Sequence, residues 1–221
     1  MSPIRFVSIK LRKKDMHVKE NIHLRKVLDY LCRCAKLTGV KQDRIMDEKI
    51  IIITTGGTIE KSYDEASGTL SNRGSHLQEM LKRVRYPFLK VEHHDLLCKD
   101  SLEMSDRDRQ LILDRVMKVL SGKSPVVILH GTDTMEITAK FLHHSIPSPP
   151  VAIVMTGAMT PFGFERSDAL QNFIEAVLAA RLAEPGVYIV MHGQVLALPG
   201  VRKNRELGTF EKFNANNANS S

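Results

Sequence analysis

The sequence predicts an α/β protein with a doubly wound, mainly parallel sheet and helices on both of its faces. Short apolar runs rich in β-branched residues have the length and composition of strands buried on both faces, as in parallel sheets. These runs are residues 50–53, 126–129, 151–155 and 187–191. Segments with helical spacing of apolar residues lie between them, and this alternation with short loops is typical of strands joined by crossover helices.

The composition is that of a soluble globular protein, with 43% hydrophobic and 26% charged residues in a chain of 221. This length accommodates one α/β domain, with or without an appendage. No run approaches the ~18 apolar residues of a membrane span, and residues 1–20 lack the apolar core of a secretory signal. The three cysteines form neither a disulfide framework nor a metal-ligand spacing. We therefore expect a cytoplasmic protein with no membrane attachment.

The net charge of +7 is concentrated at the N-terminus. Residues 1–48 contain 12 Lys and Arg against 6 Asp and Glu, whereas residues 49–221 contain 20 against 19. A protein that binds nucleic acid through its main domain needs a basic surface there. The distribution therefore predicts no nucleic-acid partner for the main domain.

Residues 1–48 are predicted to be a basic N-terminal extension, and three interpretations are open. Apolar residues at helical spacing predict a helix over about 20–37. This helix would contact RNA, an acidic partner or a membrane surface, or it would pack on the domain. In the third interpretation, which we favour, the extension is no part of the functional protein, because Met46 would make a natural start just before the first strand.

The first strand is followed by polar residues 59–68, which end in glycine and predict a mobile loop. Helical spacing then predicts a helix over about 74–84, and a second strand is expected at 88–91. His93 and His94 follow that strand. Neighbouring residues of a strand point to opposite faces, so this pair does not predict a metal site.

The second half of the chain continues the alternation of helices and strands. Ser105 and Asp108 have the spacing of a helix N-cap, and the helix should extend to about Leu120. The residues of this helix expected to face inward are Leu111, Ile112, Val116, Val119 and Leu120. Asp133 or Thr134 should cap the next helix. Further expected elements are a helix at 135–144, a helix from Ser167–Asp168 to about Leu182, a short hairpin at 194–198 and a disordered Asn-rich segment at 214–219.

Three strands end in loops rich in glycine and hydroxyl groups, at residues 54–58, 130–134 and 156–160. Parallel strands place such loops at one edge of the sheet, so the loops should converge. They match neither a dinucleotide or phosphate-binding glycine loop nor a Gly-x-Ser-x-Gly elbow. Threonines with the carboxylate of Asp133 suit a hydroxyl nucleophile that attacks an acyl group while backbone amides hold the oxyanion. The alternative for the first loop is an ordinary β-turn.

Two of these loops resemble a known pair of motifs. Residues Thr55–Ile59 together with His130–Glu136 are similar to the paired signature of the bacterial-type L-asparaginase/glutaminase family. Residues 100–104 resemble the loop of that family that binds the substrate carboxylate, and 156–159 with 172–177 resemble its following strand and helix. The similarity covers about residues 49–193, and it implies the flavodoxin-like fold of the family's catalytic N-terminal domain.

The resemblance implies a role for each matched residue. Thr58 matches the nucleophile, and Thr132 matches the second threonine, beside the amide carbon and the hydrolytic water. Asp133 matches the carboxylate that binds the substrate α-ammonium, and Ser101 matches the serine that binds its α-carboxylate. The alternative roles are turn threonines, a helix cap and a loop serine.

Further assignments depend on departures from the family pattern. Tyr63 follows the nucleophile by only five residues, and the helix after Asn172 offers only Arg181 where the family has its catalytic lysine. An arginine is a poor base because it hardly loses its proton, so Lys203 is the better candidate, with a solvated basic turn as the alternative. Both features resemble a compact, single-domain branch of these asparaginases, in which Tyr63 and Lys203 would transfer protons.

The remaining expectations concern binding and organisation. Gly57 and Gly131 should shape the oxyanion-binding turns, and Glu103 should assist Asp133 with the substrate ammonium. The chain ends about where the smaller C-terminal domain of the two-domain enzymes would begin, so weaker substrate binding is expected. The domains are expected to be 1–48, a catalytic domain at 49–213 and a disordered tail at 214–221.

The function expected from this resemblance is hydrolysis of L-asparagine to L-aspartate and ammonia, without a metal or an organic cofactor. The resemblance to the family also implies a homo-oligomer. L-Glutamine or another small amide is the alternative substrate, because one methylene is worth only ~1–3 kcal/mol in a pocket. The alternative of another class is a non-catalytic amino-acid-binding or regulatory domain.

Overall fold

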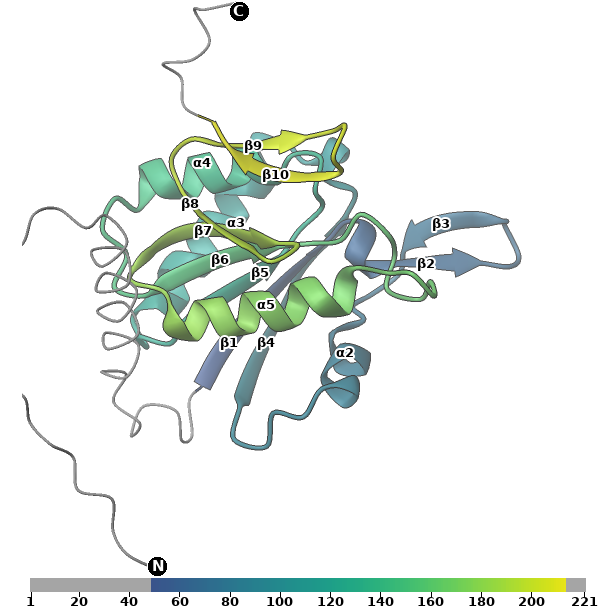
Figure 1. Cartoon of the computed structure of the whole chain (residues 1–221), viewed down its shortest axis with the longest axis horizontal. Coiled ribbons are helices and arrows are strands. Elements are labelled where there is room, and N and C mark those ends of the chain that lie inside the picture. The colour runs from purple at the N-terminus through teal and green to yellow at the C-terminus, as the bar shows by residue number, and fades with distance from the viewer. Residues whose placement is uncertain (1–48, 214–221) are drawn as a thin grey trace, which may run out of the picture. The chain divides into compact units, whose positions relative to one another are not determined.

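Six strands form the central sheet of the computed structural model, which describes residues 49–213 (Figure 1). The predictions for 1–48 and 214–221 lie outside the described residues. The sheet order is β4-β1-β5-β6-β7-β8, with β8 antiparallel at one edge and the other pairs parallel. The strands are β1 (Lys49–Gly56), β4 (Lys90–Lys99), β5 (Val126–Leu129), β6 (Ala152–Thr156), β7 (Gly186–Met191) and β8 (Gln194–Ala197).

Helices cover both faces of this sheet, which confirms the predicted fold class (Figure 1). Ile51 and Ile53 of β1 pack in the core beneath α3 and α4, whereas Ile50 and Ile52 pack beneath α2 and α5. Successive strand residues point to opposite faces, so four consecutive isoleucines supply apolar contacts to both layers. The helices are α2 (Leu77–Arg83), α3 (Asp106–Leu120), α4 (Met135–Ser145) and α5 (Ala169–Leu182).

The strand order reverses beside β1. The chain passes from β1 outward to β4 and then returns to β5 on the other side of β1. In open α/β sheets, ligands bind at such a switch point, outside the carboxyl ends of the strands. The loops after β1 and β5 are the ones that carry Thr58 and Thr132, so the topology places both threonine loops at this point.

The prediction of a loop over residues 59–68 is wrong. A short 3-10 helix, η2 (Thr58–Glu60), leads into an antiparallel hairpin of β2 (Lys61–Asp64) and β3 (Thr69–Asn72) that projects from the sheet (Figure 1). Asp64 makes the tight turn, because its carbonyl accepts the N–H of Gly68, whose φ of 67° suits glycine. The segment is polar because both hairpin strands are at least partly exposed to solvent.

Several other elements are longer or differently oriented than expected. The second strand extends over ten residues to Lys99, and its His93 and His94 point to opposite faces, toward Thr54 and Arg115 respectively. The capping box of α3 is present, but the prediction that Leu111 faces inward is wrong, since its side chain is 42% exposed. The hairpin at the end of the sheet is confirmed as β7 and β8.

A second hairpin follows the sheet, formed by β9 (Val201–Asn204) and β10 (Thr209–Lys212). It contacts α4, and Val201 and Phe210 anchor it in the core, where each is 1% exposed. Lys203 therefore lies on an ordered strand and not in a solvated turn. Within residues 49–213, no helix is long and apolar enough to cross a membrane.

Candidate active site

The loops that follow β1, β4 and β5 are in contact. A Cβ added to Gly57 would lie 2.3 Å from both Cα and N of Gly131, and one added to Gly131 would lie 2.5 Å from Oγ of Ser101. Only glycine permits these approaches. Thr58 and Thr132 directly follow the two glycines, so the structure brings both threonine loops and Ser101 to one place.

Gly57 also has a backbone conformation that glycine adopts readily, with φ 84°. Its N–H donates to the Lys99 carbonyl at 2.9 Å. The amide of Gly57 is therefore engaged within the protein, at a tight turn of the backbone.

Replacing Gly57 with alanine is expected to disrupt this turn. The new methyl group would overlap the Gly131 backbone, and the positive φ would be strained. We expect a loss of roughly 3 kcal/mol or more in the free energy of unfolding, measured by urea denaturation. Gly163→Ala is the control, because an added Cβ there has open space. A Gly57→Ala variant as stable as the wild type would contradict the close contact.

Lys203 joins these loops from the β9–β10 hairpin. Its Nζ donates to Oγ1 of Thr132 and to Oδ1 of Asp133, at 2.9 Å each, and its side chain is only 12% exposed. Its backbone N–H donates to the carboxylate of Glu136 at 2.6 Å, which holds strand β9 against α4. The cluster Thr132–Asp133–Lys203 thus unites a hydroxyl, a carboxylate and an amine.

Asp133 has a second cationic neighbour that the sequence did not suggest. The guanidinium of Arg205 lies 3.3 Å from Oδ1 of Asp133, although the arginine side chain is 71% exposed. Thr134 is the N-cap residue of α4, as one of the two predicted alternatives had it, but its side chain makes no capping hydrogen bond. The hydroxyl of Thr134 instead donates to the Ser101 carbonyl at 2.8 Å, which ties the loop after β5 to Ser101.

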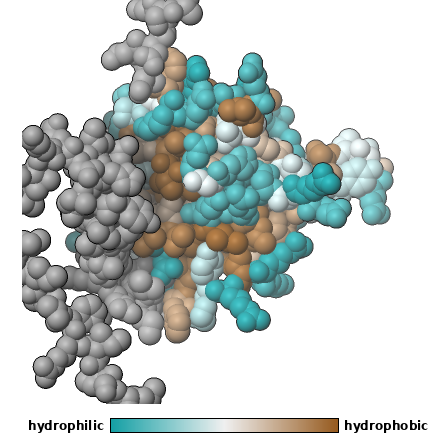
Figure 2. Space-filling view, in the orientation of Figure 1, coloured by the Kyte–Doolittle hydropathy of each residue, from teal (hydrophilic) through white to brown (hydrophobic). Residues whose placement is uncertain are grey.

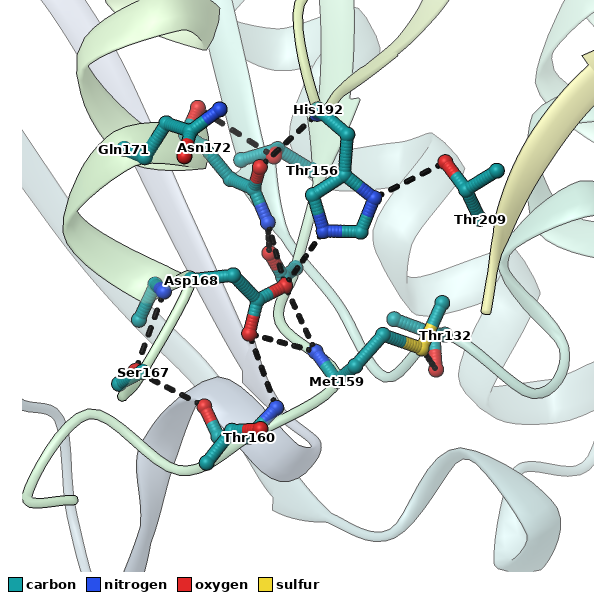
Figure 3. A network of polar contacts seen from close by, with 12 residues as sticks. Thr132, Thr156, Met159, Thr160, Ser167, Asp168, Gln171, Asn172, His192 and Thr209 are labelled. Atoms are coloured by element: carbon teal, nitrogen blue, oxygen red, sulfur yellow. Dashed lines mark hydrogen bonds and ion pairs between the residues drawn. The ribbon is translucent and has the colours of Figure 1, made fainter. Parts of the chain in front are cut away.

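A polar network supports the other side of Thr132 (Figure 3). The hydroxyl of Thr132 donates to Sδ of Met159 at 3.6 Å. The carboxylate of Asp168 accepts the backbone N–H groups of Met159 and Thr160, and it also contacts Nε2 of His192 at 2.9 Å. Burial alone raises the pKa of Asp168, but these hydrogen bonds outweigh it and lower the pKa below its ordinary value.

His192 extends the network to the hairpin that carries Lys203. Its Nδ1 contacts Oγ1 of Thr209 in β10 at 2.9 Å, and Thr209 pairs with Asn204 of β9 (Figure 3). The loop with Met159 and the hairpin with Lys203 both reach Thr132 and are both held through His192. Sequence reasoning treated Asp168 only as a helix start and missed His192, whose signal would have been its place at the end of a strand before glycine.

His130 is completely buried beneath the same loop. Its Nδ1 donates to the Gly131 carbonyl at 2.7 Å, and Nε2 accepts the hydroxyl of Thr138 at 3.0 Å. Burial lowers the pKa of His130 to about 4, with a smaller contribution from Arg109 in the same direction. The ring is therefore neutral at physiological pH and acts as a fixed support for Gly131.

The pKa of His130 predicts a loss of stability in acid. The folded pKa lies below the unfolded value of 6.5. The contribution of neutral, buried His130 to the free energy of unfolding is therefore complete above pH 6.5 and declines as the pH falls towards 4. Between pH 7.5 and 5 we expect His130 to account for a loss of about 2 kcal/mol. Urea denaturation of wild type and His130→Gln should show a shallower decline for the variant, and parallel curves would contradict the assignment.

Two further predicted site residues are exposed. Tyr63 is on β2 with its side chain 59% exposed, beside an open hollow of about 770 Å³ that is also lined by Leu70 and Phe164. Glu103 is exposed in the 3-10 helix η3 (Ser101–Glu103). Ser101, in contrast, is 1% exposed and lies against Gly131. Residues 49–213 contain no group of three or more His, Cys, Asp or Glu side chains that could hold a metal ion.

The chain is similar in sequence to several known proteins. The L-asparaginase of Thermococcus kodakarensis is 30% identical over 168 residues, which cover 75% of this chain and 51% of that protein. A glutamyl-tRNA(Gln) amidotransferase subunit from Aeropyrum pernix is 34% identical over 169 residues, covering 71% of this chain and 39% of the relative. The chain thus spans about half the length, or less, of these relatives.

Solved structures show the same fold. The thermostable L-asparaginase from Thermococcus kodakarensis superposes with a TM-score of 0.67 and 28% identity, covering 74% of this chain and 51% of that one. A probable cytoplasmic L-asparaginase from Campylobacter jejuni gives a TM-score of 0.62 and 28% identity, with coverage of 75% and 51%. The family model described as "Asparaginase, N-terminal" matches residues 49–220. This chain belongs to the asparaginase family.

Proposed function

We propose that the chain hydrolyses the side-chain amide of L-asparagine to L-aspartate and ammonia, with Thr58 as the nucleophile. The observation that carries the proposal is the contact of Lys203 Nζ with the Thr132 hydroxyl and the Asp133 carboxylate, at 2.9 Å each. This cluster adjoins the Thr58 turn through the contact of Gly57 with Gly131. It combines a group for proton transfer with a carboxylate that suits a substrate ammonium.

In the proposed reaction, Oγ1 of Thr58 attacks the amide carbon and gives up its proton. The carbonyl oxygen becomes an oxyanion, for which the backbone amides of Thr58 and Thr132 are the proposed donors. The carbon–nitrogen bond then breaks, and the nitrogen takes up a proton and leaves as ammonia. A water molecule near Thr132 hydrolyses the resulting ester, which releases aspartate and restores the hydroxyl of Thr58.

Lys203 is the base that the geometry supports better. Its amine is largely buried and contacts Thr132, whereas Tyr63 is mostly exposed on the projecting hairpin. Its Nζ also lies 2.9 Å from the Asp133 carboxylate, the group proposed to bind the substrate ammonium. Tyr63 stays an alternative for proton transfer.

Substrate recognition is proposed to involve Asp133 for the α-ammonium and Ser101 for the α-carboxylate, with Glu103 in a supporting role. Asp133 already has Lys203 and Arg205 as cationic partners. The substrate ammonium must compete with them, so modest affinity is expected. Isothermal titration with L-aspartate should detect tighter binding by Arg205→Ala, and unchanged affinity would contradict this competition.

The second candidate is hydrolysis of L-glutamine or of another small amide. Relatives named as subunits of a glutamyl-tRNA(Gln) amidotransferase favour this candidate, because their name refers to glutamine and not to asparagine. The side chains of the two amino acids differ by one methylene, which a pocket discriminates only weakly. The test is ammonia release from L-asparagine and L-glutamine side by side, with the amino-acid product identified by NMR. Binding of either amino acid without ammonia release would instead favour a non-catalytic binding or regulatory domain.

A homo-oligomer and a cytoplasmic location also stay proposals. Apolar side chains reach the surface along α5, where Ile174, Leu178 and Leu182 recur at every fourth residue (Figure 2). An exposed apolar stripe of this kind supports self-association of the chain. Light scattering after size-exclusion chromatography would measure the mass in solution, and a monomeric mass would contradict the proposal.

A further inference from the structure

Glu60 is a buried carboxylic acid directly behind the proposed nucleophile. It is the last residue of the 3-10 helix that begins at Thr58, and it is only 2% exposed. The mechanism proposed above gives it no role. Asp and Glu are seldom so fully buried unless they are paired, and the contacts of Glu60 within residues 49–213 include no cation. Its burial therefore requires an explanation.

The carboxyl of Glu60 turns back onto the loop that precedes Thr58. Its Oε2 accepts the N–H of Gly56 at 2.9 Å, and its own backbone N–H donates to the Gly57 carbonyl at 3.1 Å. Glu60 thus bonds to the backbone of both glycines that shape the turn. The φ angles of Gly56 and Gly57 are 94° and 84°, a region that needs specific support from the surrounding contacts.

The space around the turn leaves it few alternatives. A Cβ on Gly56 would lie 2.4 Å from N and O of Lys99, so β4 packs directly against the backbone there. Three hydrogen bonds define the path of the chain into Thr58: Gly56 to the Glu60 carboxyl, Gly57 to the Lys99 carbonyl, and Glu60 to the Gly57 carbonyl. The bond from Gly56 is the one of the three that depends on a side chain.

The surroundings of the carboxyl make its charge costly. Burial raises the pKa of Glu60 to about 7, against the opposing effects of hydrogen bonds from the Ser75 side chain and the Gly56 amide. Asp95 of β4 is the charged group that faces it, and its negative charge acts in the same direction as burial. Oε1 makes no hydrogen bond of good geometry to the described residues. The protonated acid and the carboxylate thus both occur near neutral pH.

We propose that Glu60 is a positioning residue, whose carboxyl holds the Gly56–Gly57 turn and thereby orients Thr58, and whose neutral form is the more active one. The inference rests on the proposed function of Thr58. Either form accepts the Gly56 N–H. Ionisation of Glu60 adds a negative charge near the turn whose amides are proposed to bind the oxyanion. This charge repels the developing oxyanion, and it also repels Asp95, which disfavours the position of the carboxyl that holds the turn.

Two substitutions separate the hydrogen bond from the charge. Glu60→Gln keeps an oxygen acceptor for Gly56 but cannot ionise, whereas Glu60→Ala removes both. We expect Glu60→Ala to lower kcat roughly tenfold or more with little change in KM, and Glu60→Gln to retain most of the wild-type kcat at pH 6. Glu65→Ala, on the exposed tip of the β2–β3 hairpin, is the control. A folded Glu60→Ala variant with the wild-type kcat would overturn the inference.

The pH profile provides the second kinetic readout. The ratio of kcat for Glu60→Gln to kcat for the wild type should be constant below pH 6 and rise about threefold or more by pH 8.5, because only the wild type gains the buried charge. A pH effect that does not involve Glu60 is common to both proteins and cancels in the ratio. A ratio that does not change with pH would show that the charge of Glu60 has no effect on the reaction.

A measurement that does not depend on activity completes the test. The amide resonance of Gly56, followed by NMR from pH 5 to 9, should shift with a midpoint near 7 in the wild type and should not shift in Glu60→Gln. A Gly56 resonance with no such titration would overturn the inference. Should the wild type release no ammonia from any amide tested, the proposed function fails, and the Gly56 titration still decides whether Glu60 holds the turn.

Discussion

Replacing Thr58 with alanine is expected to lower ammonia release from L-asparagine by roughly a thousandfold or more. The proposed reaction forms an ester on the hydroxyl of Thr58, and alanine has no atom on which that ester can form. Alanine also fits the space of threonine, and the hydrogen bonds that hold the turn, from the Gly56 and Gly57 amides and the Glu60 backbone, do not involve the Thr58 side chain. The protein should therefore stay folded, and kcat should fall without a matching loss of stability.

Three controls make the Thr58 result specific. Thr58→Ser keeps a hydroxyl and should retain activity within about an order of magnitude. Thr69→Ala removes an exposed hairpin threonine and should leave the rate unchanged. Rapid acid quenching followed by mass spectrometry of the peptide that contains residue 58 should detect an aspartyl ester in the wild type and none in Thr58→Ala. A folded Thr58→Ala variant that hydrolyses asparagine at the wild-type rate would refute Thr58 as the nucleophile.

Replacing Lys203 with methionine is expected to lower kcat by roughly a hundredfold to ten-thousandfold, the usual range for loss of a general acid or base. Methionine has a similar length and fills the largely buried space of the lysine side chain, but it neither transfers a proton nor donates to Thr132. Since Lys203 Nζ lies 2.9 Å from both Thr132 Oγ1 and Asp133 Oδ1, the loss should also reorient that hydroxyl. The measurement is kcat for L-asparagine over pH 6 to 9.

The neighbouring Arg202 provides the matched control for Lys203. It lies on the same strand, is largely exposed and pairs with Glu211 across the hairpin, at 2.7 Å. Arg202→Met should keep most of the activity, because its side chain points away from Thr132. Lys203→Arg should be nearly as impaired as Lys203→Met, because a guanidinium does not act as a base. An active Lys203→Met variant would assign proton transfer to another group, with Tyr63 as the next candidate.

The fold could be predicted because its signals are local. Four consecutive isoleucines satisfy both faces of a central strand, and Ser105 with Asp108 forms the predicted capping box. The glycine–threonine loops follow directly from strand ends, so parallel strands bring them to one edge. The hairpin at 61–72 was missed because its strands are polar and none of their residues is buried, so they lack the apolar alternation that marks a half-buried strand.

The sequence by itself determined the order of the central strands and their helices, the threonine loops and most of the candidate residues. Only the tertiary structure decided which of these residues meet. Lys203 contacts Asp133 across 70 positions of the sequence, because the β9–β10 hairpin packs against α4. His192, in the turn between β7 and β8, contacts Asp168 across 24 positions. The tertiary structure likewise decided that the Gly57 amide bonds to Lys99 of β4, and that Glu60 is buried near Asp95 of β4 and Ser75. Periodicity reports which face of an element is buried, whereas a hydrogen bond between distant elements depends on packing in three dimensions.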